Sequence, residues 1–383
     1  MSVGPKRVMF YVQHLLGIGH VKRAASLAKG MAESGLDVTV VLGGMAVADV
    51  DFGFAKCVFL PSARALDQTF STIVDVNGQP INPTWKTARC HQLLAIYDDI
   101  KPDVLMVELF PFGRRAFRFE LLPLLDRARN DCFITCSVRD VLVQKNDDVK
   151  TRQAIDWVKH YFNLVLVHGD PRFIGFAETF PAASEIEHLI RYTGYVVDRP
   201  NMSDGSLAGL DEIIISTGGG AVGAELIETA LLAQPISPHK NRKWRILAGH
   251  NLSENQFQRF KNQAPSGVIV ERARPDFHTL LNNAAVSVSQ GGYNTVMDIL
   301  VSQCRAVIVP FAEAQESEQT YRARKFADLG RLVMIGQANL TAETLNLAIE
   351  QAIKSVSCPL EGPDLNGVDK TIEILLDPHA MTG

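Results

Sequence analysis

The feature that most constrains the fold is a regular alternation of short apolar segments with longer amphipathic ones. Residues 7–13 (RVMFYVQ) are apolar, residues 19–35 have the pattern of a helix, and residues 37–44 (DVTVVLGG) are apolar again. Strands that are apolar on both faces and separated by helices are typical of a parallel sheet with helices on both sides. The sequence therefore predicts an α/β fold.

The alternation continues along the chain in two series. The first has further apolar segments at 56–61, 103–108, 132–138 and 164–169, and the second has them at 212–220, 244–249, 267–272, 285–290 and 305–311. Between the series, residues 194–211 are rich in Gly, Ser, Asp and Pro, which favour turns and linkers. A chain of 383 residues is also long for one core, since domains usually hold about 150–200 residues.

We therefore expect two Rossmann-like, doubly wound parallel-sheet domains that face one another across a cleft. The N-terminal domain is placed at 1–195 and the C-terminal domain at 206–360, and residues 361–383 are expected to pack back toward the N-terminal domain. The chain has no apolar run of about 18 residues, which a membrane span needs, and its first residues are expected to form a strand and not a signal peptide. We expect a cytoplasmic protein without a transmembrane segment.

The net charge of −4 argues against a general nucleic-acid binder, which would carry a positive surplus. A basic and aromatic segment is formed locally by Arg114, Arg115, Arg118, Phe112, Phe117 and Phe119. Such a surface would rest on anionic lipid and make the protein peripheral at the inner face of the membrane. The alternative is a solvated helix face.

Ligands of open α/β sheets bind beyond the carboxyl ends of the strands, so the residues that follow each predicted strand are the candidates for a site. In the first domain these are Gly17, Gly19, His20, Glu108, Arg139, Asp140, His168 and Asp170. Arg139 with Asp140 is interpreted as a local ion pair, with anion binding as the second reading. His168 and Asp170 are interpreted as pocket lining or a turn.

His20 and Glu108 are the candidate catalytic residues. His20 closes a glycine loop at the end of the first strand, where a near-neutral pKa would suit a general base or an oxyanion-stabilising cation. Glu108 ends an apolar strand beside aromatic residues, which would raise its pKa and let it accept a proton. The alternatives are a helix-end hydrogen-bond donor for His20 and an ion partner of Arg114 or Arg115 for Glu108.

In the second domain two glycine-rich stretches, 216–226 (STGGGAVGAEL) and 289–299 (SQGGYNTVMDI), each lead from a strand into a helix. Exposed amides at a helix start bind phosphate without a metal, because the unsatisfied N–H groups and the helix dipole both favour an anion. Asp298 lies one to two turns into the second helix, where its carboxylate would accept hydrogen bonds from ribose. Tight packing of helix on strand is the alternative for either loop alone, and two such loops in one domain favour binding.

No metal or other cofactor is expected, and the six cysteines lack the paired spacings of a zinc site. The candidate ligand-binding residues of this domain are Thr217, Gly218, Gly219, Gly220, Arg274, Gln290, Gly291, Gly292, Tyr293, Asn294, Thr295, Asp298, Glu318 and Gln319.

Residues 290–330 resemble the donor-binding signature of GT-B glycosyltransferases, and in particular the MurG-like family, glycosyltransferase family 28. The pattern is a strand, a small-residue elbow, a helix with an acid, an apolar strand ending in Pro, and a polar loop closing with Gln. Weaker similarity extends over GIGH (17–20), TGYVVDR (193–199) and STGGGAVGAE (216–225).

The resemblance implies a role for each matching position. Asp298 stands where the family has a Glu that holds the ribose hydroxyls, and Glu318 and Gln319 stand where the family contacts the donor sugar. Arg274 stands where backbone groups read the uracil edge, and His20 stands at the family's active-site His. The two glycine loops, at 218–220 and 291–295, would face the diphosphate.

One departure from the family lies in the first domain, where DVLMVELFPFGRR (103–115) replaces a second glycine-rich loop. This segment should shape the acceptor side, so the lipid-linked acceptor of the peptidoglycan enzyme is not carried over. The chain is similar to an uncharacterised branch of the predicted GT-B transferases.

The resulting expectation is a metal-independent, inverting glycosyltransferase of polysaccharide or glycolipid biosynthesis. It would move a sugar from a UDP-linked donor, such as a UDP-N-acetylhexosamine, to an acceptor hydroxyl of a glycan, a lipid-linked sugar or a small molecule. The alternatives are a nucleotide-sugar epimerase of the UDP-N-acetylglucosamine 2-epimerase type and a non-catalytic nucleotide-sugar-binding protein.

Overall fold

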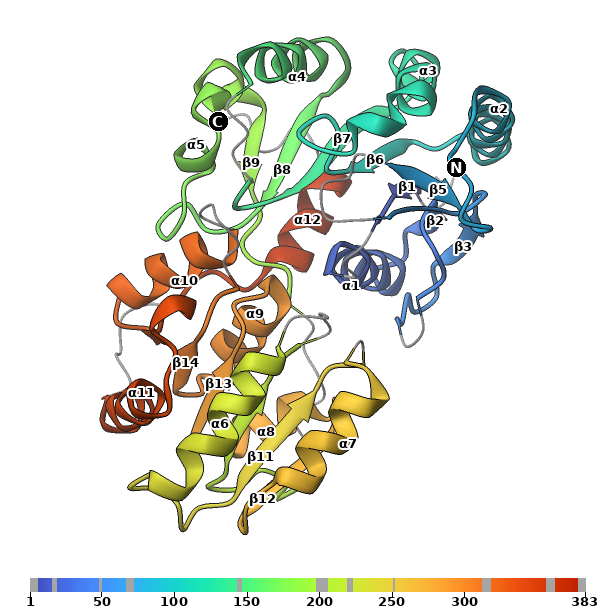
Figure 1. Cartoon of the computed structure of the whole chain (residues 1–383). Helices are drawn as coiled ribbons and strands as arrows, with labels where there is room; N and C mark the ends of the chain where they lie inside the picture. The colour runs from blue at the N-terminus through green and yellow to red at the C-terminus, as the bar shows by residue number, and fades with distance from the viewer. Residues whose placement is uncertain are drawn as a thin grey trace. The chain divides into compact units, whose positions relative to one another are not determined.

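The computed structural model describes residues 6–15, 19–47, 50–66, 72–142, 147–197, 206–218, 223–250, 252–311, 318–355 and 362–377 (Figure 1). The chain divides into two compact units. Unit 1 contains residues 1–196 and 364–383, and unit 2 contains residues 197–363. Each unit is built on one parallel sheet, so the predicted α/β class with two Rossmann-like sheets is confirmed.

The sheet of unit 1 has the strand order β3-β2-β1-β6-β7-β8-β9, with parallel neighbours throughout. Its strands are β1 (Arg7–Val12), β2 (Asp37–Leu42), β3 (Lys56–Phe59), β6 (Val104–Glu108), β7 (Phe133–Arg139), β8 (Leu164–His168) and β9 (Ile190–Tyr192). Six of these lie in predicted apolar segments. The short strand β9 and a small hairpin of β4 (Ala63–Ala65) and β5 (Ile73–Asp75) were not predicted.

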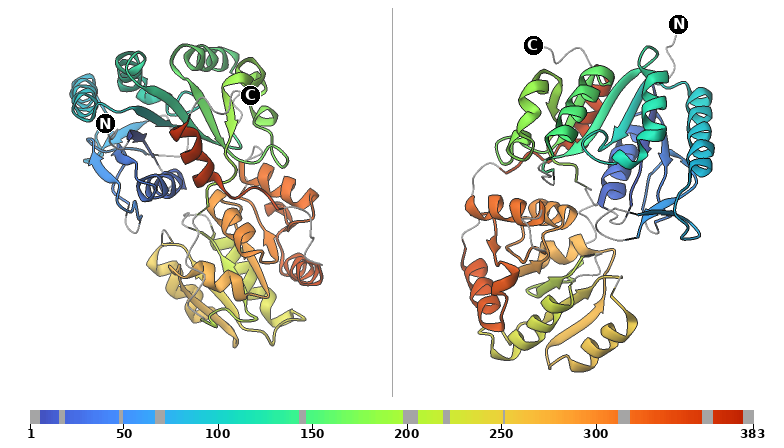
Figure 2. Two further views of the ribbon diagram at one scale, coloured as in Figure 1. Left: turned by 180° about the vertical axis from the view of Figure 1, so that it is seen from behind. Right: turned by 45° about the horizontal axis from the view of Figure 1, so that its top comes forward.

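Helices cover both faces of this sheet, as the views in Figure 2 show. They are α1 (Gly19–Glu33), α2 (Pro83–Ile100), α3 (Arg118–Ala128), α4 (Asp148–Tyr161), α5 (Phe176–Thr179) and α12 (Gly367–Leu376), with the 3₁₀ segments η1 (Arg115–Phe117) and η2 (Pro181–Leu189). Side chains of β1 alternate between two buried clusters: Met9 and Tyr11 pack with α2, α3 and α4, whereas Val8 and Phe10 pack with α1 and α12. Burial on both faces explains why the strand is apolar without alternation.

Unit 2 has a smaller parallel sheet with the order β12-β11-β10-β13-β14-β15. The strands are β10 (Ile213–Ser216), β11 (Trp244–Ala248), β12 (Val268–Arg272), β13 (Val286–Ser289), β14 (Ala306–Ile308) and β15 (Val333–Met334). The helices are α6 (Ala224–Ile236), α7 (Glu254–Gln263), α8 (Phe277–Asn283), α9 (Tyr293–Ser302), α10 (Glu318–Asp328) and α11 (Ala342–Lys354), with η3 at Gln337–Asn339. The adjacent pair β10 and β13 forms the point where the strand order reverses, which is where open α/β sheets bind ligands.

The C-terminal helix returns the chain to unit 1. The amide of Tyr195 donates a hydrogen bond to the carbonyl of Asp364 at 2.7 Å, and the amide of Gly367 donates to the carbonyl of Tyr195 at 3.1 Å. Unit 2 is therefore inserted between two chain segments that are hydrogen-bonded to each other. None of the helices in the described part of the chain has the length and hydropathy that crossing a bilayer requires.

Candidate functional site

In unit 1 the structure brings both candidate catalytic residues together. His20 is the second residue of α1 and Glu108 is the last residue of β6. The Nδ1 atom of His20 lies 2.7 Å from Oε1 of Glu108, and Nη2 of Arg23, one turn further along α1, lies 2.6 Å from the same oxygen. Glu108 is buried and the His20 side chain is 14% exposed, so the ring of His20 is the member of this group that solvent can reach.

The electrostatics correct the expectation for Glu108. Burial alone would raise the pKa of its carboxyl, but His20, Arg23 and Arg114 outweigh burial and lower this pKa to about 2. The prediction of a raised pKa was wrong because the sequence did not show which cations would surround the strand end. A carboxylate with so low a pKa is a poor proton acceptor at neutral pH. Glu108 instead acts as a fixed negative charge beside the ring.

The near-neutral pKa expected for His20 was also wrong. Burial lowers this pKa to about 4, with Glu108 opposing the change and Arg114 and Arg139 adding to it. The ring is therefore uncharged at neutral pH and does not provide the oxyanion-stabilising cation considered from the sequence. A neutral histidine has one N–H and one nitrogen lone pair, and the lone pair can accept a proton.

Of the other candidates of unit 1, His168 and Asp170 have local hydrogen-bond partners. Gly17 lies outside the described residues, and Gly19 begins α1. His168 is buried between the hydroxyls of Ser137 (2.8 Å) and Thr193 (2.9 Å), with its pKa lowered to about 3 mainly by burial. Both carboxylate oxygens of Asp170 bind the guanidinium of Arg172.

One ring of the predicted basic and aromatic segment is buried, and the contact with lipid stays a prediction. Phe117 is fully buried, and Phe112 makes edge-to-face contacts with Phe176 and Phe180. Phe117 is therefore removed from the surface, whereas Phe112 and Phe119 are half-buried and Arg118 is exposed.

In unit 2 the first glycine-rich stretch follows β10. The hydroxyl of Thr217 accepts a hydrogen bond from the amide of Gly249 at 3.1 Å, which ties the ends of β10 and β11 together. Gly218 has a φ of +60°, and a Cβ atom placed there would meet no neighbour within 4 Å among the described residues. Gly219 and Gly220 lie outside the described residues.

The second stretch begins at the end of β13, whose Ser289 pairs with Ser216 of β10. Gly292 is the N-cap of α9, and a Cβ atom there would have no described neighbour closer than 4.0 Å, from Oγ1 of Thr295. At Gly291, in contrast, a Cβ atom would lie 3.2 Å from Cγ2 of Ile308 and 3.3 Å from the carbonyl oxygen of Gln319. Gly291 is therefore needed for packing, whereas Gly292 leaves space before the helix that none of the described residues fills.

Further along α9, Tyr293 is buried with the guanidinium of Arg322 over its ring, and Asn294 and Thr295 are half-buried. Asp298 lies on the same helix with one carboxylate oxygen 3.1 Å from Nε2 of His278 on α8. Sequence reasoning did not select His278, because nothing in its local pattern indicated that α8 would place it beside Asp298.

The remaining candidates of unit 2 also have protein partners. Glu318 forms an ion pair with Arg322 at 2.7 Å, and the side-chain carbonyl of Gln319 accepts a hydrogen bond from the amide of Phe311 at 3.2 Å. Arg274 follows the edge strand β12, and its guanidinium binds the carboxylate of Asp276. The contacts proposed for these residues with a donor remain predictions.

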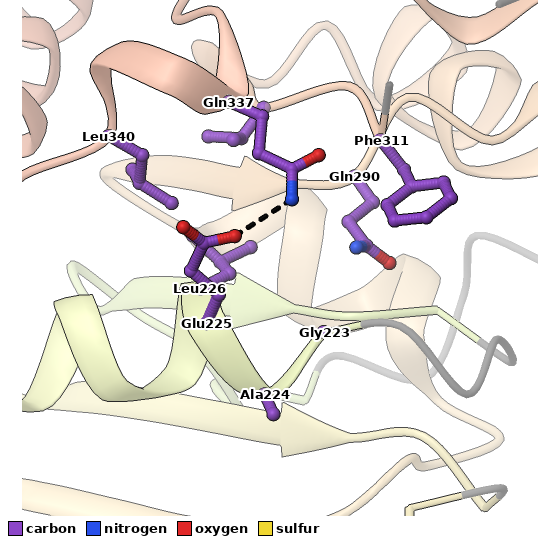
Figure 3. A pocket seen from close by; sticks show the side chains of 9 residues that line it. Gly223, Ala224, Glu225, Leu226, Gln290, Phe311, Gln337 and Leu340 are labelled. Carbon is purple, nitrogen blue, oxygen red and sulfur yellow. Dashed lines mark hydrogen bonds between the residues drawn. The ribbon is translucent and has the colours of Figure 1, made fainter. Parts of the chain in front are cut away.

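A pocket of about 190 Å³ lies at the carboxyl edge of the unit 2 sheet (Figure 3). Its lining residues are Gly223, Ala224, Glu225, Leu226, Gln290, Val309, Phe311, Gln337 and Leu340. Gln337 donates a hydrogen bond to Glu225 at 2.8 Å, which joins η3 to the first turn of α6. Gln290 alone was a candidate from the sequence; the others come from helices and loops that only the fold brings together.

Residues 214–361, which make up most of unit 2, match the model of the glycosyltransferase family 28 C-terminal domain. Unit 2 is a family 28 C-terminal domain. The resemblance predicted from residues 290–330 is thereby confirmed. The match includes the two glycine-rich stretches, Asp298 and the pocket.

Curated relatives match parts of the chain. A UDP-N-acetylglucosamine–N-acetylmuramyl-(pentapeptide) pyrophosphoryl-undecaprenol N-acetylglucosamine transferase of Synechocystis sp. is 36% identical over 69 residues, 18% of this chain and 19% of that protein. The protein of the same name from Desulforamulus reducens is 26% identical over 152 residues, 38% of this chain and 41% of that protein. The matches thus span between about a fifth and two fifths of these relatives.

Solved structures resemble the whole chain. Acinetobacter baumannii MurG has a TM-score of 0.62 and 16% identity, covering 97% of this chain and 99% of that chain. A UDP-GlcNAc 2-epimerase of Methanocaldococcus jannaschii has a TM-score of 0.60 and 9% identity, covering 97% and 99%. At these identities the similarity shows the fold, so the predicted GT-B architecture of the family 28 domain and its companion unit is confirmed.

Proposed function

We propose that the chain is a glycosyltransferase whose family 28 domain binds a UDP-linked sugar. The observation that carries the proposal is the match of residues 214–361 to the family model, because that segment holds the second glycine-rich stretch and Asp298 at the strand-order reversal. The space beside Gly292, which none of the described residues fills, supports a diphosphate at the start of α9. Asp298 would then bind ribose, with the ring of His278 beside its carboxylate.

The chemistry proposed for the donor needs no metal. Negative charge develops on the departing diphosphate, and preorganised amides at a helix start stabilise such charge without reorganisation. Donor binding and turnover are therefore expected to persist in EDTA. Strict dependence on added Mg²⁺ or Mn²⁺ would contradict this part of the proposal.

His20 is the proposed base for the acceptor hydroxyl. Its Nδ1 hydrogen is committed to Glu108, so the Nε2 lone pair of the neutral ring would receive the proton. General base catalysis by a positioned side chain is worth about 10²–10⁴-fold in rate. Glu108 and Arg23 hold the ring and its tautomer and do not take up the proton themselves.

Calorimetric titration with UDP tests the donor site directly. Wild-type protein is expected to bind UDP in EDTA, and Asp298→Ala is expected to weaken binding by at least about tenfold, the loss of one to two hydrogen bonds to a charged group. Glu350→Ala is the matched control, because Glu350 is an acid of the same unit that pairs with Lys354 on α11. Equal UDP affinity in all three proteins would overturn the assignment of Asp298.

Turnover assays distinguish a glycosyltransferase from an epimerase and from a non-catalytic binding protein. UDP-N-acetylhexosamines incubated with the protein and candidate hydroxyl acceptors should release UDP in an acceptor-dependent way. Appearance of an epimeric UDP-sugar without acceptor would establish an epimerase instead. UDP binding that needs Asp298, together with no turnover and no effect of His20→Ala on function in cells, would indicate a non-catalytic binding protein.

A further inference from the structure

Unit 1 contains a fully buried ion pair between Arg89 of α2 and Glu120 of α3. Nε of Arg89 lies 2.8 Å from Oε2 of Glu120, and Nη2 lies 2.9 Å from Oε1. The hydroxyl of Tyr11 on β1 donates a hydrogen bond to Oε1 of the same carboxylate at 2.5 Å. The aromatic rings of Trp85 and Phe117 pack on the guanidinium, with their centroids 5.3 Å and 5.1 Å from its central carbon.

The other N–H groups of Arg89 join the ends of three neighbouring strands. Nη2 donates to the side-chain carbonyl of Gln13, directly after β1, at 2.5 Å. Nη1 donates to the backbone carbonyls of Gly43, directly after β2, at 3.0 Å and of Pro61, two residues after β3, at 2.5 Å. A guanidinium has five N–H donors in a fixed fork, and these contacts together with those to Glu120 use all five. Because β1, β2 and β3 are parallel neighbours, their ends lie at one carboxyl edge of the sheet, where α/β proteins bind ligands.

The two glycines after β2 make room for this arrangement. A Cβ atom at Gly43 would lie 2.2 Å from both Nη2 of Arg89 and Oε1 of Gln13. A Cβ atom at Gly44 would lie 2.2 Å from the ring of His14. A larger residue at position 43 would therefore push the guanidinium away from the strand ends, and glycine permits the close approach.

A buried ion pair contributes little to stability compared with apolar packing. Taking two charges out of water is costly, and replacing such a pair with apolar side chains of similar volume is often neutral or stabilising. The pair contributes geometry instead, because a planar guanidinium fixes the directions of its hydrogen bonds. Arg89 thus specifies where the ends of β1, β2 and β3 lie.

The end of β1 connects Arg89 to the candidate catalytic residues. The backbone carbonyl of Gln13 accepts a hydrogen bond from Nε of Arg114 at 2.5 Å. Arg114 lies in the turn after β6, the strand that ends at Glu108 and pairs with β1 on the side opposite β2. Burial lowers the pKa of His20 and the positive charge of Arg114 lowers it further, whereas Glu108 opposes both. Gln13 therefore contacts Arg89 through its side chain and Arg114 through its backbone.

We propose that Arg89 is a positioning residue for the reaction at His20. Through Gln13 it holds the end of β1, to which Arg114 is hydrogen-bonded, and through two backbone carbonyls it fixes the ends of β2 and β3 at the same edge. A misplacement of about 1 Å that originates far from the reacting atoms can cost about 10²-fold in rate. The inference rests on the proposed function for the reaction, whereas the coupling of Arg89 to His20 is independent of that function.

Replacing the buried polar group with apolar side chains tests the proposal in the full chain. Arg89→Met, Glu120→Leu and Tyr11→Phe are combined, so that neither a charge nor the tyrosine hydroxyl is left buried without its partner. The triple variant is expected to remain folded in a thermal scan and to bind UDP with wild-type affinity, while kcat for sugar transfer falls by at least about tenfold. Asp98→Leu with Arg127→Met is the matched control and should keep the wild-type kcat, because this exposed pair joins the same two helices at 2.9 Å.

Arg89→Lys is the second variant and separates charge from geometry. Lysine keeps a positive charge beside Glu120, but its three donors share one nitrogen and cannot reproduce the planar fork that reaches Gln13 and both backbone carbonyls. This variant is expected to fold and still to lose kcat. A wild-type kcat in Arg89→Lys or in the folded triple variant overturns the proposal, and Arg89→Lys decides alone if the triple variant does not fold.

Titration of the His20 ring by NMR is a readout that a merely structural role of Arg89 would not move. The charged groups that act on this ring are Glu108, Arg23, Arg114 and Arg139. Arg89→Lys should raise the pKa of His20 from about 4, because Arg114, whose charge lowers this pKa, is no longer held in place. An unchanged pKa contradicts the coupling. If the wild type transfers no sugar, the proposed function fails, and this titration still decides whether Arg89 acts on His20.

Discussion

At the scale of single residues, the contact between His20 and Glu108 determines which nitrogen can act as a base. Glu108 is ionised at neutral pH and can only accept hydrogen bonds, so Nδ1 of His20, 2.7 Å away, must carry the hydrogen. Arg23 also approaches Nδ1, at 3.5 Å, but the shorter contact to the carboxylate decides the tautomer. The lone pair therefore lies on Nε2.

This arrangement predicts an unusual acid limb in the pH–rate profile. The base form of His20 is lost only when pH falls through a pKa of about 4, so kcat/KM should stay level well below pH 6.5, the ordinary histidine value. The carboxylate of Glu108 raises the pKa of His20, so Glu108→Gln should lower this pKa further. The substitution also leaves the tautomer of His20 undetermined. We expect the variant to lose at least about tenfold in kcat/KM without moving the acid limb upward.

A matched control for this prediction is Asp98→Asn, because Asp98 is an exposed acid that pairs with Arg127 on the outer side of unit 1. The control should keep the wild-type rate and profile. An acid limb centred near pH 6.5 in the wild type would mean that His20 is not buried as the structure describes, or that it is not the base.

At the scale of elements, the two glycines between β13 and α9 have different roles: Gly291 is closely packed, and Gly292 is the N-cap of α9. An alanine at position 291 would press on Ile308 and on the backbone of Gln319, so Gly291→Ala should destabilise the protein by about 1–3 kcal/mol. Serine is a preferred N-cap, so Gly292→Ser should leave stability unchanged to within about 0.5 kcal/mol while its side chain enters the space before the helix. Urea unfolding and UDP titration of both variants measure the two effects. Weakened UDP binding by Gly292→Ser with normal stability supports a diphosphate there, and unchanged UDP binding contradicts it.

The packing of α1 against α12 gives a second prediction at this scale. A Cβ atom at Gly30 would lie only 2.2 Å from Cγ1 of Val368, a stiff β-branched side chain on α12. Gly30→Ala is therefore expected to destabilise unit 1 by about 1–3 kcal/mol. Combining it with Val368→Ala should recover part of the loss, and a double-mutant cycle by chemical denaturation measures this coupling. Additive effects would show that the two helices do not approach as closely as the structure has them.

The elements were predictable from the sequence to a greater degree than the site. Buried parallel strands have continuous apolar sequences, so the ends of β1, β6 and β13 were predicted to within about two residues. β15 has only two residues and was missed. The direction of the pKa shift of Glu108 and the contact of Asp298 with His278 depend on side chains from separate elements, which a single sequence does not bring together.

At the scale of the whole molecule, the chain leaves unit 1 and returns to it. The apolar residues Ile372, Ile374 and Leu375 of α12 fill one of the two buried clusters of unit 1. Burying an aliphatic side chain of this size is worth about 1.5–3 kcal/mol. Loss of three of them is comparable with the whole stability of a domain, about 5–15 kcal/mol. Residues 1–196 are therefore expected not to fold stably without residues 364–383.

Excision of unit 2 tests this arrangement. Because the amide of Tyr195 and the carbonyl of Asp364 are 2.7 Å apart, a linker of about four residues suffices to join residue 196 to residue 364. The joined protein should unfold cooperatively in a thermal scan, whereas residues 1–196 alone should not. Residues 197–363 contain their own core and should fold separately, binding UDP with the affinity of the full chain. Stable folding of 1–196 alone would contradict the role given to α12, and loss of UDP binding by a folded 197–363 fragment would show that unit 1 supplies part of the donor site.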